Sequence, residues 1–131
     1  AQYADLAEIY SADAEYEPGT VVRIGGEAEI TQTTDHADTE VFGVISTQAA
    51  YLMNGSAGSN ETHPPIAMSG RVPVRVVGIV KKGDRLVSAG NGLARSAKQG
   101  EANAFNVIGR ALETKSSAEE GTVEAIVTIS S

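Results

Sequence analysis

Hydrophobic residues recur mostly at every second position, in short runs separated by glycine, proline and polar residues. Residues 71–77 and 122–129 alternate most clearly, and successive side chains of a strand point to opposite faces, so both runs predict half-buried β-strands. Residues 40–46 are apolar almost without interruption, which predicts a strand buried on both faces. Pro73 lacks an N–H group, so we expect its strand at a sheet edge.

Turn residues divide the rest of the chain into further short strands. Gly25-Gly26 predicts a hairpin between residues 20–24 and 27–31, and residues 81–84 and 89–92 predict turns on either side of residues 85–88. We expect two more strands at residues 93–95 and 105–112. A strand about every ten residues is typical of a sandwich or barrel. The predicted fold class is therefore all-β, with short antiparallel strands and tight glycine turns.

The first residues fit the alternating pattern less well. Leu6, Ile9 and Tyr10 have the spacing of one helical face, which predicts a short N-terminal helix, although so short a segment suits an extended arm equally well. The sequence begins with Ala1 and not Met, so we expect a fragment of a longer chain. We assign residues 1–15 to a lead-in segment from a preceding region and residues 16–131 to a single β domain.

Composition narrows the possible partners. The chain has 131 residues, the usual size of one domain, and no cysteine. Its net charge of −7 disfavours nucleic acid as a partner, and no apolar run approaches the roughly 18 residues of a membrane span. The charge is uneven: residues 1–61 hold eleven acids and one base, whereas residues 62–131 hold six acids and nine bases. We expect an acidic pole and a weakly basic pole.

No motif in the sequence carries recognisable chemistry. His36 and His63 lie in separate polar loops outside any metal-binding pattern, and Asp38 lies near His36 without the glycine and terminal glutamate of a calcium loop. We therefore predict no catalytic residue, no cofactor and no metal, and a protein that is not an enzyme. The loops at 33–39 and 54–65 are expected to be exposed, which makes their polar residues candidates for contact with a receptor: His36, Asp38, Asn54, Asn60 and His63.

Six segments together resemble a known group of proteins: residues 3–8, 16–22, 41–46, 70–74, 80–84 and 107–112. They are similar to the C-terminal domains of bacteriophage tail fibres and related virion proteins. The resemblance spans nearly the whole chain, and its segments are strand and turn patterns without chemistry. It implies a structural tip or cap domain on the virion, a homotrimer that attaches to the host surface, where a polysaccharide is one candidate receptor. The face formed by Leu6, Ile9 and Tyr10 is then the candidate interface between copies.

The first part of the chain is also similar to a phage domain that acts as an intramolecular chaperone and cuts itself free after trimer assembly. That family's cleavage residues cannot be matched to positions in this sequence. Self-cleavage therefore stands as the alternative function, and a carbohydrate-binding or lyase domain is a third option that the scarcity of aromatic residues disfavours.

Overall fold

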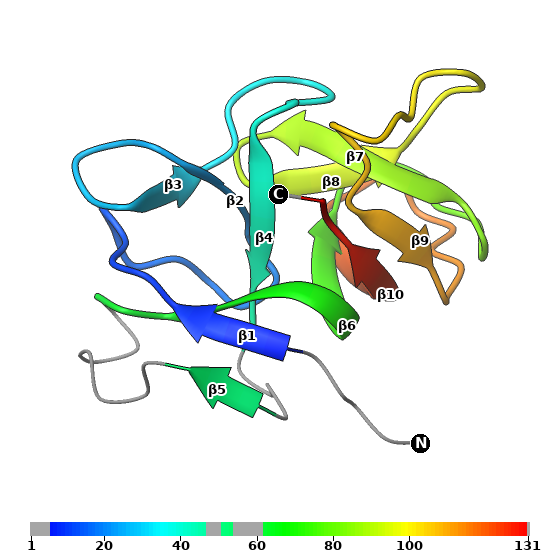
Figure 1. Cartoon of the computed structure of the whole chain (residues 1–131). Coiled ribbons are helices and arrows are strands. Elements are labelled where there is room, and N and C mark those ends of the chain that lie inside the picture. Colours follow the sequence, from blue (N-terminus) through cyan, green and yellow to red (C-terminus); the bar gives the residue numbers. More distant parts are fainter. Residues whose placement is uncertain (1–5, 47–50, 54–61, 131) are drawn as a thin grey trace.

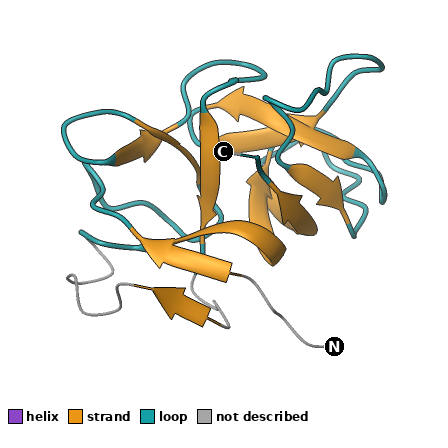
Figure 2. Cartoon of the chain, viewed as in Figure 1, coloured by secondary structure: helices purple, strands orange, loops and turns teal. Residues whose placement is uncertain are grey.

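The protein is a small β-barrel with additional strands bonded to its outside (Figure 1). The computed structural model describes residues 6–46, 51–53 and 62–130. These residues form ten strands: β1 (Leu6–Ile9), β2 (Val21–Ile24), β3 (Ile30–Gln32), β4 (Val41–Ile45), β5 (Tyr51–Met53), β6 (Pro65–Val76), β7 (Arg85–Gly90), β8 (Leu93–Ser96), β9 (Gly109–Ala111) and β10 (Gly121–Thr128). The described part contains no helix, so it contains none long enough to cross a membrane (Figure 2). The predicted all-β class is confirmed.

The barrel closes through the second half of the chain. Strand pairings run from β6 to β10, β9, β7 and β8 and then back to β6. The longest of these ladders joins β6 and β10, and it places the two alternating segments of the sequence side by side. Their inward residues are small and fully or nearly fully buried, so the narrow interior is filled by side chains: Val72, Val74, Val76, Val123, Ala125 and Val127.

Strand β6 also carries the extra strands. In Figure 1 its first half lies beside β1, and it then turns into the barrel next to β10. Strand β4 pairs with β6, β2 pairs with β4, and β3 pairs with β2. All five residues of β4 are buried because it lies between two apolar clusters. Val41 and Val44 contact the first, which includes the barrel interior, and Phe42 and Ile45 contact the second. The predicted two-sided burial is confirmed.

The predicted edge position of Pro73 is wrong. Strand β6 pairs on both sides, and Pro73 lies opposite Glu124 of β10. The N–H of Arg75 donates to the Gly19 carbonyl at 3.0 Å, away from β10. Nitrogens two residues apart in a strand point to the same side, so the Pro73 nitrogen also points away from β10. There it lies between the β4 and β8 pairings and interrupts neither ladder.

Two other predictions need correction. The N-terminal segment is a strand and not a helix: β1 pairs antiparallel with β6 and parallel with β5, so the extended alternative is the correct one. The strand expected at residues 105–112 is shorter, because only Gly109–Ala111 pair with β10 and residues 103–107 form a turn. The division into segments 1–15 and 16–131 stays a prediction, although Ala7 already contributes to the larger apolar cluster.

Candidate functional site

Loop 33–39 is bonded to strands β7 and β8. The Ala37 N–H donates to the Ser88 carbonyl at 2.8 Å, and the Ser88 hydroxyl donates to the Asp35 carbonyl at 2.8 Å. His36 is exposed, and its Nδ1 accepts a hydrogen bond from Arg95 Nε at 3.0 Å. These bonds fix the loop on the barrel and leave the imidazole at the surface. Contact between His36 and a receptor stays a prediction.

Asp38 has a structural role inside the same loop. Asp38 is only 4% exposed, so its predicted exposure is wrong. Oδ1 accepts the Glu40 N–H at 2.9 Å, and Oδ2 lies 3.5 Å from Arg23 Nη1 without a hydrogen bond in the described structure. A buried carboxylate requires such compensation, and here it stabilises the start of β4. The Asp38 side chain is therefore buried and not available for contact with a receptor.

Arg95 and Glu101 form the strongest ion pair of this region. Arg95 Nη1 donates to Glu101 Oε1 at 2.8 Å and Nη2 donates to Oε2 at 2.5 Å, a bidentate geometry. The hydrogen bonds from Arg95 and, with a smaller effect, the one from the Lys98 N–H lower the pKa of Glu101 to about 2. The same contacts raise the pKa of Arg95. The pair ties loop 97–107 to β8, next to a hollow of about 650 Å³ that His36, Arg95 and Lys98 border.

Loop 97–107 ends in a compact turn held by two asparagines. The Asn103 side chain accepts the N–H groups of Phe105 and Asn106 at 2.8 and 3.1 Å, and the Asn106 side chain accepts the Asn103 N–H at 2.8 Å. Asn106 Nδ2 also donates to the Glu101 carbonyl at 3.0 Å. These bonds satisfy the local backbone and fix the position of Phe105, which is 73% exposed. The turn therefore presents a large apolar side chain to solvent.

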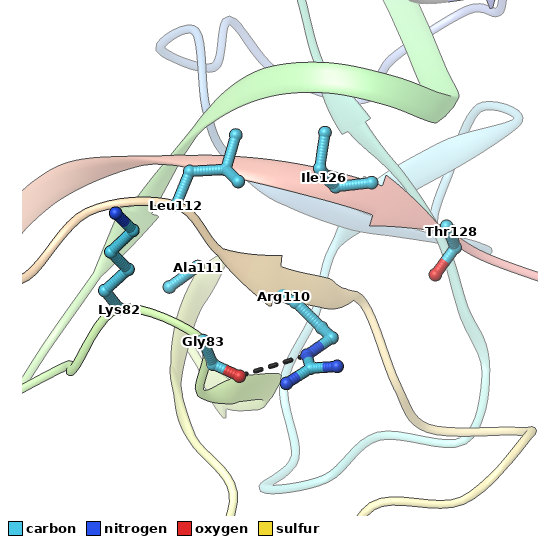
Figure 3. Close-up of a pocket in the computed structure, with 7 residues that line it drawn as sticks. All are labelled: Lys82, Gly83, Arg110, Ala111, Leu112, Ile126 and Thr128. Atoms are coloured by element: carbon cyan, nitrogen blue, oxygen red, sulfur yellow. Dashed lines mark hydrogen bonds between the residues drawn. The ribbon is translucent and has the colours of Figure 1, made fainter.

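An apolar hollow of about 380 Å³ lies on the outer face of β9 and β10 (Figure 3). Ile126 and Leu112 form its apolar part, with Ile126 opposite Arg110 in the β9–β10 ladder. Arg110 Nε donates to the Gly83 carbonyl at 3.0 Å, which holds the guanidinium at the rim. Lys82 lies at the rim as well. The hollow is apolar inside and cationic at its edge.

Two of the predicted interface residues, Ile9 at the end of β1 and Tyr10 directly after it, have contacts within their own chain. Ile9 is buried, and Tyr10 is half-buried with its ring edge-to-face against Phe42 at a centroid separation of 5.1 Å. Burial and the hydrogen bond to Glu8 raise the pKa of Tyr10 to about 12. The side chain of Leu6 lies outside what the structure describes. The role of these three residues in an interface between copies stays a prediction.

The remaining receptor candidates lie in or beside the second polar loop. Asn54 and Asn60 lie outside the described residues. His63 is half-buried, and its Nδ1 is 2.9 Å from the Thr62 hydroxyl. The neighbouring Thr62 carbonyl accepts the Ala12 N–H at 2.9 Å. The structure thus brings His63 close to the N-terminal segment and does not group it with His36.

Among the described residues no cluster of three or more histidine, aspartate or glutamate side chains could hold a metal ion. The sequence interpretation missed Phe105 and the β9–β10 hollow because it assigned residues 105–112 to one strand. Asn103 and Asn106 were the available signal, since asparagine side chains that bond nearby backbone favour turns over strands.

No protein family model matches the chain, and no curated protein matches it. Solved structures of bacteriophage phi29 proteins do. The crystal structure of the gene product 12 C-terminal fragment has a TM-score of 0.68 at 14% identity, over 95% of this chain and 100% of that one. The pre-mature gene product 12 gives 0.70 at 16% identity, over 99% of this chain, which spans only 22% of that protein.

A third similar structure is the N base of the phi29 head fiber gp8.5, with a TM-score of 0.53 at 14% identity over 97% of this chain and 95% of that one. These TM-scores establish a common fold, and identities this low do not transfer the role of any residue. The chain therefore has the fold found in domains of two phi29 proteins, gene product 12 and the head fiber gp8.5.

Proposed function

We propose that this chain is a structural domain of a bacteriophage virion, a homotrimeric tip or cap of a tail fibre that takes part in attachment to the host. The observation that carries the proposal is the similarity to the gene product 12 C-terminal fragment, which extends over all of that fragment and nearly all of this chain. The likeness to a head fiber base supports a fibre-like role more generally.

The mechanism is physical. The barrel is a rigid support, because its closed ladder leaves no unpaired edge among β6, β7, β8, β9 and β10. Loop 33–39 is bonded to that support and exposes His36, which suits it to contact a surface structure of the host, with polysaccharide as one candidate. Three copies would present such a loop three times, and multivalency would raise weak contacts to useful avidity. No covalent step is proposed.

Two measurements test this function. Size-exclusion chromatography with light scattering at micromolar concentration is expected to give a mass of three 13.5-kDa chains. A monomer would refute the trimer. The labelled trimer is then incubated separately with Gram-positive and with Gram-negative bacterial cells, and the amount retained after washing is compared with that of His36→Ala. Attachment predicts retention on at least one cell type and a loss in the variant, whereas no retention on any would argue against a receptor-binding tip.

The second candidate is an intramolecular chaperone that cuts itself free and drives trimer assembly. It is favoured by one observation: the region similar to this chain is a separate fragment in one gene product 12 structure and 22% of the pre-mature protein in another. A polypeptide that carries this domain behind its natural preceding sequence would then release a product of about this size without added protease. Intact mass spectrometry of the purified polypeptide decides, since a single uncleaved species removes this option.

A further inference from the structure

Four large apolar side chains are exposed in the described part of the chain: Ile24, Ile79, Phe105 and Ile126. Two of them lie in stretches of chain that are bonded to each other. The Ile108 carbonyl, three residues after Phe105, accepts the N–H of Thr128 at 2.9 Å, and Thr128 lines the hollow that contains Ile126. Exposed apolar groups and apolar hollows are features from which interaction surfaces are built.

The two groups differ in shape. Phe105 projects from a turn whose backbone is fixed by Asn103 and Asn106, so little conformational freedom is lost when the ring is bound. Ile126 lies in the hollow, and the lining of the hollow does not include Phe105 of the same chain. One surface is a knob and the other is a hole, and within one chain the knob does not fill the hole.

The charges at the hole also permit this contact. Arg110, held by the Gly83 carbonyl, and Lys82 give the hole a cationic rim. Residues 102–105, Ala-Asn-Ala-Phe, carry no charge, so they would meet this rim without repulsion. The face of an aromatic ring attracts a guanidinium, and that attraction adds to the burial of the ring against Ile126.

We propose that Phe105 of one copy inserts into the β9–β10 hollow of the next copy. This rests on the proposed homotrimer and names the contact that holds it together. Each copy gives one knob and receives one, so the contact is head-to-tail, and such contacts form a closed ring when the rotation between copies closes.

Two variants remove one half of the contact each. Phe105→Ala removes the knob, and Ile126→Asp places a charge in the hole; Ile126→Thr is a milder second variant in case the aspartate impairs folding. Truncating a central aromatic anchor commonly raises a dissociation constant by about 30-fold or more. We expect the trimer to dissociate at concentrations at which the wild type remains assembled. Ile24→Asp, at an isoleucine on the β2–β3 hairpin that is more exposed than Ile126, is the matched control and is expected to remain trimeric.

Mixing the two variants tests the head-to-tail arrangement. Phe105→Ala keeps an intact hole and Ile126→Asp keeps an intact knob, so the mixture can form one good contact per pair and cannot extend it. Light scattering should show one-to-one dimers in the mixture and monomers in each variant alone. Dimers that fail to appear in the mixture, or a control variant that dissociates like the others, would overturn the contact.

A fluorescent reporter gives an independent reading. The chain has no tryptophan, so Phe105→Trp introduces a single one. Its emission maximum should move to shorter wavelength on assembly and return on dilution, whereas Ile24→Trp should not change. A monomeric wild type would refute the proposed function itself. A wild-type trimer that both knob and hole variants leave intact would refute this contact alone.

Discussion

Gly109→Ala should be among the most destabilising single-methyl additions in the barrel. Gly109 lies opposite Val127 in the β9–β10 ladder, and a Cβ at this position would be 1.9 Å from the Ile126 carbonyl oxygen and 2.9 Å from the Val127 Cα. These obstacles are backbone atoms, which cannot rotate aside. An ordinary Cβ contact would require the two strands to separate by more than about 1 Å.

The energetic cost follows from the bonds beside the glycine. The Thr128 N–H donates to the Ile108 carbonyl at 2.9 Å and the Leu112 N–H donates to the Glu124 carbonyl at 2.8 Å. A separation of about 1 Å stretches both beyond hydrogen-bonding distance, at about 1 kcal/mol or more each, and overpacking adds about 1–3 kcal/mol. We expect a loss of about 3 kcal/mol or more, or a fall in Tm of roughly 12 °C for a domain of this size.

Urea denaturation and thermal unfolding at fixed protein concentration measure this loss. Gly100→Ala is the control: nothing lies within 4 Å of its added methyl group, and its φ of +82° alone should cost about 1 kcal/mol. If Gly109→Ala unfolds at the same urea concentration as Gly100→Ala or a higher one, the close approach of the β9 and β10 backbones does not determine the stability of the barrel.

Three further predictions concern single side chains. The pKa of Glu101 falls from an ordinary 4.5 to about 2 on folding, so the stabilisation by its carboxylate is present above pH 4.5 and lost as the pH falls towards 2. Glu101→Gln should therefore have a lower Tm than the wild type at pH 7, and the two Tm values should converge in acid; a difference in Tm that does not change with pH would contradict this. The pKa of Tyr10 rises from 10 to about 12 on folding, so the contribution of its hydroxyl to stability is present below pH 10 and lost as the pH rises through 12. In an ultraviolet titration, Tyr10→Phe should lack one tyrosine that titrates near pH 12; loss of a tyrosine that titrates near pH 10 would contradict the assignment. Asp38→Ala removes the acceptor of the Glu40 N–H and should cost about 2 kcal/mol in urea denaturation, whereas Asp38→Asn keeps an acceptor and should cost less than about 1 kcal/mol; equal costs would mean that the charge facing Arg23 matters more than the bond.

The pattern of alternation predicted the strands that fill the barrel, because burial on one face imposes a period of two whatever the neighbours are. It predicted that one face of the second half of β6 is buried, and likewise the face of β10 that carries Val123, Ala125 and Val127. It could not predict which strands pair, since β6 meets β10 across a long sequence separation. Pro73 shows the limit of predicting strand position from residue type. Its missing N–H excludes one hydrogen bond, and the fold accommodates this by pointing the nitrogen away from β10 and not by placing β6 at a sheet edge.

The candidate site was less predictable because it depends on loop geometry. Spacing alone placed His36 in a loop but could not show that neighbouring Asp38 turns inward towards Arg23. Phe105 was missed since an apolar residue before a short strand looks like part of that strand. Leu6, Ile9 and Tyr10 had helical spacing, yet the ladders offered by β5 and β6 on either side of β1 outweighed a weak local preference.

The central place of β6 has a consequence for how the molecule comes into being. In the ladder order, every strand before residue 65 connects to the barrel through β6, either directly or through β4 or β1, and β6 in turn needs β10 to complete its longest ladder. During synthesis from the N-terminus, β1 to β5 could pair only among themselves, β1 with β5 and β2 with β3 and β4, and the barrel could not close until residue 128 had been added. Closure of the barrel would therefore come late in the synthesis of this region, so that copies meet in their final form only after its translation is complete.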